Sequence, residues 1–158
     1  MNSKRAAAVL WMLLANGCGE PESTGPPEIR LGLDDCAECR MILSDERFAA
    51  ALVLRDEHGR LQKLLFDDLG CLLVHRGKTN PPEGAAEYVK DYTAGDWLEL
   101  EQATLVHAPE LHSPMGFAVA ACGSPAAARA LSQRKKGEII SLNEFRSDPN
   151  ALLPAGDR

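Results

Sequence analysis

Apolar residues recur along most of the chain in short runs separated by turn-forming residues. Two runs, residues 48–55 and 61–66, flank the segment Asp56-Glu57-His58-Gly59-Arg60. A glycine-containing loop between two apolar runs is typical of a β-hairpin. After the second run, residues 69–76 carry leucines at helical spacing behind Asp67-Asp68, which predicts a helix that begins next to acidic side chains. Residues 87–92 then predict a strand that returns to the sheet.

The same order of elements is predicted again in the second half. The segments are strands at 103–107 and 116–122, a helix at 126–134 that Ser124-Pro125 begins, a strand at 138–141 and a closing helical turn at 142–146. No residue-level identity relates the halves, so the repeat depends on element order alone. The pattern predicts an α+β fold in which two strand-strand-helix-strand (ββαβ) units, residues 29–94 and 95–146, meet at a cleft.

The N-terminus differs from the body of the chain. Lys4-Arg5 precede an apolar run that ends before Cys18, which is too short for a permanent membrane span and typical of a signal peptide over residues 1–17. The small residues before Cys18 resemble a bacterial lipobox and predict lipidation of Cys18; the alternative is an ordinary secretory signal. Residues 18–28 predict a flexible tether. Either interpretation places the protein outside the cytoplasm, and lipidation would anchor it in the periplasm to the inner or the outer membrane.

The charge balance limits the partners of the protein. The whole chain has a formal charge of -6, and removal of residues 1–17 takes away two basic residues and no acidic one. An acidic body is a poor nucleic-acid ligand, and without a basic patch the attachment to a membrane would depend on the acyl chains. The polar residues 147–158 predict a mobile tail.

Chemistry is concentrated in Cys36-Ala37-Glu38-Cys39-Arg40-Met41. Thiolate and thioether donors together favour Cu(I), so the segment predicts a copper site. A local disulfide, half of a zinc site and a methionine that only fills the core are the alternatives. A four-cysteine zinc site with Cys71 and Cys122 would lack a second C-x-x-C pair, and both of these cysteines are expected to be core thiols. The acidic residues around the motif favour protonated thiols before copper arrives.

A second sulfur donor lies in the loop between the two predicted strands of the second half. Only Met41 and Met115 remain after removal of the signal peptide, and Met115 belongs to a turn, Ser113-Pro114-Met115-Gly116, where a core methionine would be unusual. We therefore expect Met115 to share the site with Met41. His107 and His112 belong to the same loop and are further candidate ligands, although a solvated histidine is the ordinary alternative.

These segments resemble one known family, the nitrous oxide reductase accessory lipoproteins of the NosL type, which are copper chaperones. The matching pieces are Cys36-x-x-Cys39-x-Met41, Phe48-Ala49-Ala50, Phe66-Asp67-Asp68-Leu69-Gly70-Cys71-Leu72-Leu73, Val89-Lys90-Asp91-Tyr92, Gly95-Asp96-Trp97-Leu98 and Ser113-Pro114-Met115-Gly116. The resemblance implies a lipid-anchored periplasmic protein of two ββαβ units that binds Cu(I) through Cys36, Cys39 and Met41, with Met115 as the second donor. The family more often has glycine where Arg40 stands, so the loop is expected to lose a positive-φ conformation.

The resemblance further implies a carrier that gives copper to the assembly of the copper-sulfide centre of nitrous oxide reductase, with the reductase and its ABC-transporter-type assembly complex as partners. No paired carboxylates, activated nucleophile or phosphate-binding loop can be placed in a shared cleft, so we expect no enzymatic activity. The competing functions are thiol-disulfide exchange through the C-x-x-C pair and a structural lipoprotein with a Cys36–Cys39 disulfide.

Overall fold

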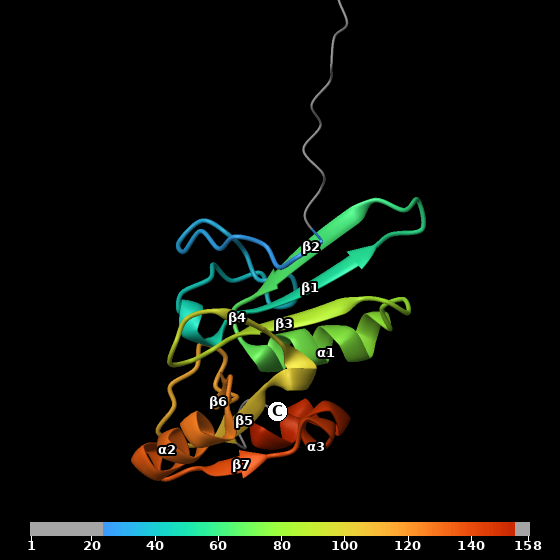
Figure 1. Cartoon of the computed structure of the whole chain (residues 1–158). Helices are drawn as coiled ribbons and strands as arrows, with labels where there is room; N and C mark the ends of the chain where they lie inside the picture. The colour runs from blue at the N-terminus through green and yellow to red at the C-terminus, as the bar shows by residue number, and fades with distance from the viewer. Residues whose placement is uncertain (1–23, 154–158) are drawn as a thin grey trace, which may run out of the picture.

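A computed structural model describes residues 24–153 of the chain (Figure 1). The predicted signal peptide, Cys18 and the first part of the predicted tether lie outside the described residues. Two antiparallel sheets and a few helices make up the rest, so the predicted α+β class is confirmed. Within residues 24–153, no helix combines the length and the apolar character that a membrane crossing requires.

The first sheet is built on a hairpin. A short 3-10 turn, η1 (Glu46–Phe48), leads into β1 (Ala50–Arg55), which pairs antiparallel with β2 (Leu61–Phe66) from Ala50↔Phe66 to Arg55↔Leu61. The predicted hairpin is therefore confirmed. Strands β3 (Ala86–Lys90) and β4 (Trp97–Glu99) complete the order β2-β1-β3-β4. Strand β4 was not predicted, because three residues are too few to show a period.

Helix α1 (Leu69–Thr79) covers this sheet, and Asp68 is its N-cap residue. The Asp68 side chain accepts a hydrogen bond from the Gly70 amide, which satisfies one of the free donors of the first turn. Leu69, Leu72 and Leu73 are buried. The helix runs three residues beyond the predicted end, to Thr79, and the C-cap Asn80 adopts the left-handed conformation before Pro81.

The second sheet repeats the arrangement at smaller size. After the 3-10 turn η2 (Leu100–Gln102) come β5 (Thr104–His107), β6 (Val119–Cys122), α2 (Pro125–Lys135) and β7 (Glu138–Ile140), with the strand order β6-β5-β7. This order matches β2-β1-β3 of the first sheet, since in each case the first strand lies between the second and the third. The strand predicted from residue 116 begins only at Val119, because Gly116 and Ala118 both have positive φ.

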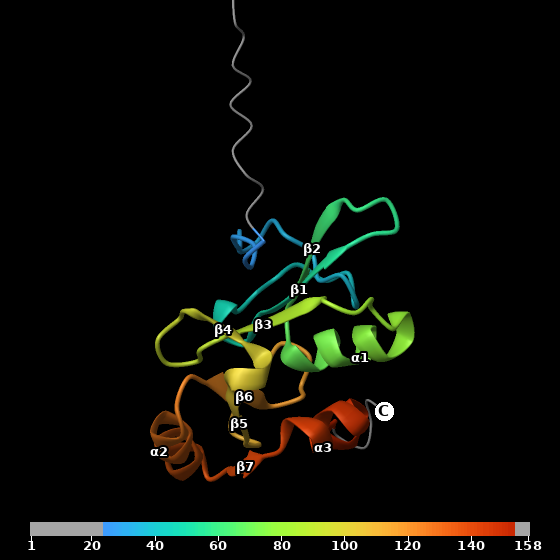
Figure 2. The ribbon, with the colours of Figure 1, turned by 45° about the vertical axis from the view of Figure 1, so that its right-hand side comes forward.

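The chain ends against the first half. Helix α3 (Leu142–Ser147) lies next to α1 in both ribbon views (Figure 2), and the 3-10 turn η3 (Pro149–Leu152) contacts α1. Leu152 and Leu153 pack against the main core cluster. The tail predicted to be mobile from residue 147 therefore begins with a packed turn, and residues 154–158 lie outside the described part.

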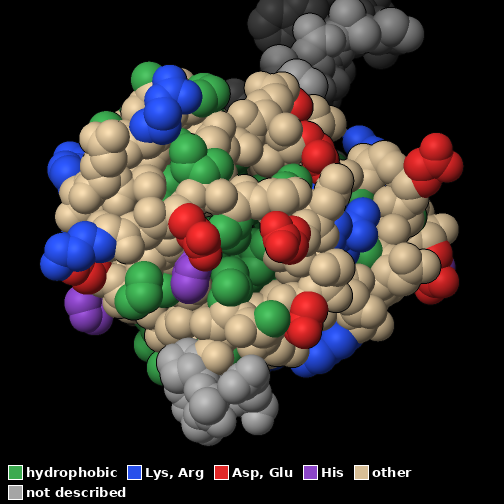
Figure 3. Space-filling model, turned by 90° about the horizontal axis from the view of Figure 1, so that it is seen from below, with side chains coloured by type: hydrophobic (Ala, Val, Ile, Leu, Met, Phe, Trp, Pro, Cys, Tyr) green, Lys and Arg blue, Asp and Glu red, His purple; other side chains and the backbone are tan. Residues whose placement is uncertain are grey.

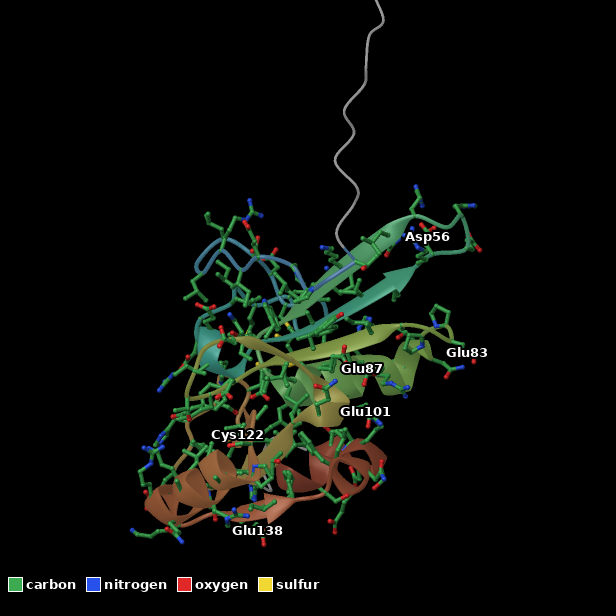
Figure 4. The ribbon with its side chains drawn as sticks, in the orientation of Figure 1. Asp56, Glu83, Glu87, Glu101, Cys122 and Glu138 are labelled. Carbon is green, nitrogen blue, oxygen red and sulfur yellow. The ribbon has the colours of Figure 1, made fainter. Side chains whose placement is uncertain are left out.

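The two halves share one hydrophobic core. Phe66 and Leu72 from the first half belong to the same buried cluster as Leu105, Phe117 and Phe145 from the second. At the edge of this junction, Glu87 and Glu101 point toward α3 (Figure 4), and Arg146 bridges them at 2.7 and 2.8 Å. The halves thus form one packed body.

Candidate metal site

Three thiols converge at one end of α1. The sulfur atoms of Cys36, Cys39 and Cys71 all lie within 4.8 Å of one another. Cys36 and Cys71 are buried and Cys39 is half-buried. All three are free thiols, so the group could hold a metal ion. The first two come from the loop before β1 and the third from the first turn of α1.

The loop that carries Cys36 and Cys39 folds back on itself. The Cys36 amide donates to the Met41 carbonyl at 2.8 Å, and the Arg40 amide donates to the Cys36 carbonyl at 3.0 Å. This tight turn requires positive φ at Arg40, which has φ 65°. The expectation that Arg40 removes this conformation is wrong: the arginine adopts it, at a cost of about 1 kcal/mol relative to glycine.

Backbone contacts fix this loop against the sheet. The Ala37 amide donates to the Leu65 carbonyl at the end of β2, at 2.8 Å. Further along, the buried Asp67 carboxylate accepts from the Ser44 amide, also at 2.8 Å. Both thiols of the loop are therefore held on the same strand end that leads into α1.

The carboxylate of the next residue, Asp68, holds the loop that carries Met115. Asp68 is fully buried, and besides capping α1 it accepts a 3.4 Å hydrogen bond from the Met115 amide. Burial raises the pKa of Asp68 to about 6, against the hydrogen bonds that favour its ionised form. Two adjacent acidic residues, Asp67 and Asp68, thus hold two loops at one point of the fold. We call residues 30–44 the cysteine loop and residues 108–118 the methionine loop.

A cavity of about 630 Å³ lies between these two loops. Its lining residues are Glu38, Cys39, Met41, Cys71, Val74, Ser113, Pro114, Met115, Gly116, Phe117, Asn150 and Leu153. Both methionines that were singled out from the sequence therefore face the same cavity as two of the three thiols. Met41 is 56% exposed, so the cavity reaches the surface at this thioether.

The thiols differ in acidity. A hydrogen bond from the Cys71 thiol lowers the pKa of Cys36 to about 5, although burial opposes ionisation. The same hydrogen bond, together with burial, raises the pKa of Cys71, and burial raises that of Cys39. These directions favour the thiolate form at Cys36 and the protonated form at Cys39 and Cys71. The expectation of protonated thiols depended on the acidic residues around the motif, whereas the leading causes of these shifts are burial and the hydrogen bond between Cys36 and Cys71.

The structure does not bring the candidate histidines into the cavity. His112 is exposed, and the Nδ1 atom of half-buried His107 lies 3.9 Å from the Glu138 carboxylate at the edge of the second sheet. Another histidine, His75 of α1, contacts a cavity residue: its Nδ1 lies 3.1 Å from an oxygen of Glu38. Among the cavity residues of the described chain there is no imidazole.

Sequence reasoning missed the place of Cys71. Its burial was expected, but the three-thiol group was not, because the spacing along the chain does not show that the first turn of α1 meets the cysteine loop. The acidic cap at Asp68 was the available signal for the start of α1, and it places Cys71 in the first turn but does not show what that turn packs against. Cys122, by contrast, lies on β6 in a separate buried cluster (Figure 4), where burial raises its pKa to about 11.

Comparison with known proteins identifies the family. The NosL family model matches residues 31–149, which include both metal-site loops and both sheets. No curated protein matches the chain. Since the match covers most of the sequence, the chain belongs to the NosL family.

Proposed function

We propose that this protein is a carrier of Cu(I) rather than an enzyme. The observation that carries the proposal is the meeting of two thiols and two thioethers at one cavity, with the third thiol, Cys36, within 4.8 Å of the other two. No imidazole is found among the cavity residues of the described chain. Thiolate and thioether ligands are soft and select Cu(I) over hard cations. The copper ion is cargo here, bound at one time and released at another.

The burial of the donors suits uptake and release. Cys36 is completely buried and supplies the resident negative charge, whereas Met41 stands at the surface. An incoming Cu(I) would meet the neutral thioether first and then displace a proton from Cys39 or Cys71 as it binds deeper. Release would follow the same route in reverse, with a ligand of the receiving protein replacing a sulfur atom at the mouth.

Location and partners extend the proposal. The family membership and the sequence of residues 1–28 support a lipid-anchored periplasmic protein. On the same basis, the receiver is nitrous oxide reductase together with its ABC-transporter-type assembly complex, and the delivered copper enters the catalytic copper-sulfide centre. The tether would let the carrier reach between a donor at the membrane and this receiver.

Thiol-disulfide exchange is the second candidate, and one observation favours it. Three free thiols close to one another, one with a lowered pKa, are suited to attack a disulfide. However, Cys36 and Cys39 lie in a loop before β1 and not at the start of a helix after a strand, where a thioredoxin-like protein carries its pair. The carrier proposal therefore explains more of the site.

Two measurements on anaerobically purified protein separate these functions. Titration of Cu(I) against a competing chelator should show one tight site, and X-ray absorption should show sulfur as the dominant neighbour of copper. Replacing Cys39 with Ser should weaken binding more than replacing Met41 with Leu, because only the thiolate contributes charge. If the protein reduces disulfides at a useful rate and binds no Cu(I) in the presence of a weak competitor, the exchange function is correct instead.

A further inference from the structure

The exposed large hydrophobic side chains of the described chain are not spread evenly. They are Leu31, Leu33, Met41, Ile42 and Ile139. All but Ile139 belong to the cysteine loop, and their exposed fractions are 47% for Leu31, 73% for Leu33, 56% for Met41 and 53% for Ile42. Single exposed hydrophobic residues are ordinary on protein surfaces, but a cluster of this kind marks an interaction site. We call these four residues the apolar rim.

The backbone holds the apolar rim in place. Residues 32–36 and 41–43 run antiparallel, joined by hydrogen bonds between Gly32 and Leu43 at 3.1 Å and between Leu43 and Asp34 at 2.8 Å, and by a bridge between Asp35 and Ile42. Side chains of such a pair alternate between two faces. Cys36 and Leu43 turn into the core, and Ile42 and Asp35 turn out. The fold that buries a metal-site thiol therefore turns Ile42 outward on the opposite face, whereas Met41, opposite Cys36, stays on the side of the cavity and reaches the surface at its mouth.

The apolar rim is continuous with the metal site. Met41 belongs to both, because it lines the cavity and is more than half exposed. A protein that takes a metal ion from this cavity by ligand exchange must bring its own ligand to within bonding distance of the mouth, and so must cover the residues around Met41. Of the exposed large hydrophobic residues in the described part of the chain, Met41 alone lines the cavity.

The charges disfavour a lipid bilayer as the occupant. Asp35 is exposed between the hydrophobic residues, and beside it Arg30 and Asp34 form an ion pair at 2.5 Å. Insertion into hydrocarbon would have to desolvate these groups, and the chain as a whole carries a net negative charge that anionic headgroups repel. On the face that carries β7, seen in Figure 3, hydrophobic side chains lie between acidic ones. No residue of β7 lines the cavity.

From these observations we infer that Leu31, Leu33, Met41 and Ile42 form the docking surface for the protein that receives copper. This inference depends on the proposed carrier function. The partner surface that fits is apolar and carries a soft-metal ligand, a thiolate or a thioether, near its centre. Docking shields the exchange from water while the metal passes from sulfur to sulfur.

The test compares two variants of the full lipidated protein in nanodiscs. One is Leu33→Asp/Ile42→Asp, which charges the apolar rim without touching a sulfur donor, and the control is Ile139→Asp on β7. Copper transfer is measured to copper-free nitrous oxide reductase with its purified assembly complex, and separately to a small Cu(I) chelator. We expect the rim variant to bind Cu(I) and to lose it to the chelator as the wild type does, but to transfer copper to the protein receiver at least tenfold more slowly. The control should behave as the wild type in every assay.

Each other result overturns the inference. A rim variant that transfers copper to the protein receiver at the wild-type rate shows that docking occurs elsewhere, while the carrier function stands. A wild-type protein that binds no Cu(I) removes the carrier function itself. Two further controls use the mature chain with Cys18→Ser: binding to phosphatidylethanolamine/phosphatidylglycerol vesicles that the rim variant loses would make the bilayer the occupant, and dimers that the rim variant loses would make it a second copy.

Discussion

The sulfur atoms of Cys36 and Cys71 lie within 4.8 Å of each other, although one belongs to a loop before the first strand and the other to the first turn of α1. A hydrogen bond from the Cys71 thiol lowers the pKa of Cys36 and so favours a negative charge on its sulfur. Cys71 therefore has two roles, since it stabilises that charge and offers a sulfur atom of its own.

We expect Cys71→Ser to lower the affinity for Cu(I) by about tenfold or more, because a lost thiolate ligand removes both softness and charge. Cys122→Ser is the matched control: this residue is also a buried cysteine, but it does not belong to the cluster of Cys36, Cys39 and Cys71. Chelator competition under anaerobic conditions measures the affinity, and thermal unfolding monitors the fold. Equal affinities in the two variants would remove Cys71 from the ligand set.

Arg40→Gly should stabilise the protein by about 0.5 kcal/mol. Glycine relieves the cost of φ 65° but loses part of this gain through the greater freedom of the unfolded chain. Arg40→Ala removes the same side chain and keeps the strain, so it should not stabilise. Urea unfolding of the three proteins measures the difference, and equal gains in both variants would assign the effect to the charge instead.

Asp91 joins the two sheets and should make stability depend on pH. Its carboxylate accepts hydrogen bonds from the amides of Thr93 and Ala94 at the turn after β3 and of Gly123 after β6. Burial opposes ionisation of Asp91, but these amides outweigh it and lower the pKa below 3.8. The stabilisation is therefore complete above pH 4 and disappears as the pH falls through the lowered pKa.

Asp91→Asn should consequently lower the free energy of unfolding at pH 7 by about 1–3 kcal/mol, because it replaces a charged acceptor by a neutral amide. The difference from the wild type should shrink as the pH is lowered below 4. Urea unfolding between pH 7 and pH 3 tests this, and a difference that stays constant over the range would contradict the role of the charge.

Helix α1 and the methionine loop approach each other at Gly70. A Cβ atom at this position would overlap the ring of Phe117, which follows Met115 in the cavity wall. Gly70→Ala should cost about 1–3 kcal/mol by overpacking. It should also weaken Cu(I) binding, since the loop that carries Met115 must move.

Gly77 provides the control on the same helix. It is exposed, and a Cβ atom there would meet nothing within 4 Å. Gly77→Ala should stabilise α1 by up to about 1 kcal/mol through helix propensity and leave copper binding unchanged. Thermal unfolding of both variants measures the change in stability, and chelator competition measures the change in Cu(I) affinity. A Gly70→Ala protein as stable as the wild type would show that the ring of Phe117 can move freely.

The sequence predicted most elements because their periods are local. The hairpin around Gly59, the helix behind Asp68 and the capped helix after Ser124 all follow from residues within a few positions of each other. The site was predictable only in part. Met41 could be assigned from its neighbours and Met115 from its unusual turn, but the approach of Cys71 depends on how α1 packs, which no local pattern contains. His107 and His112 were named for their residue type, and the packing of β5 and the loop after it keeps them away from the cavity.

The shared core has a consequence for how the cavity can change. One wall of the cavity belongs to the first half, through Cys39 and Met41, and the other belongs to the second half, through Met115. The distance between the sulfur atoms of the two walls therefore depends on the relative position of the two halves. Arg146, which ties α3 to Glu87 of the first sheet and to Glu101 of the second half, acts on that relative position. Because Arg146 is not itself a cavity residue, a change there would shift the two walls relative to each other without removing a sulfur donor.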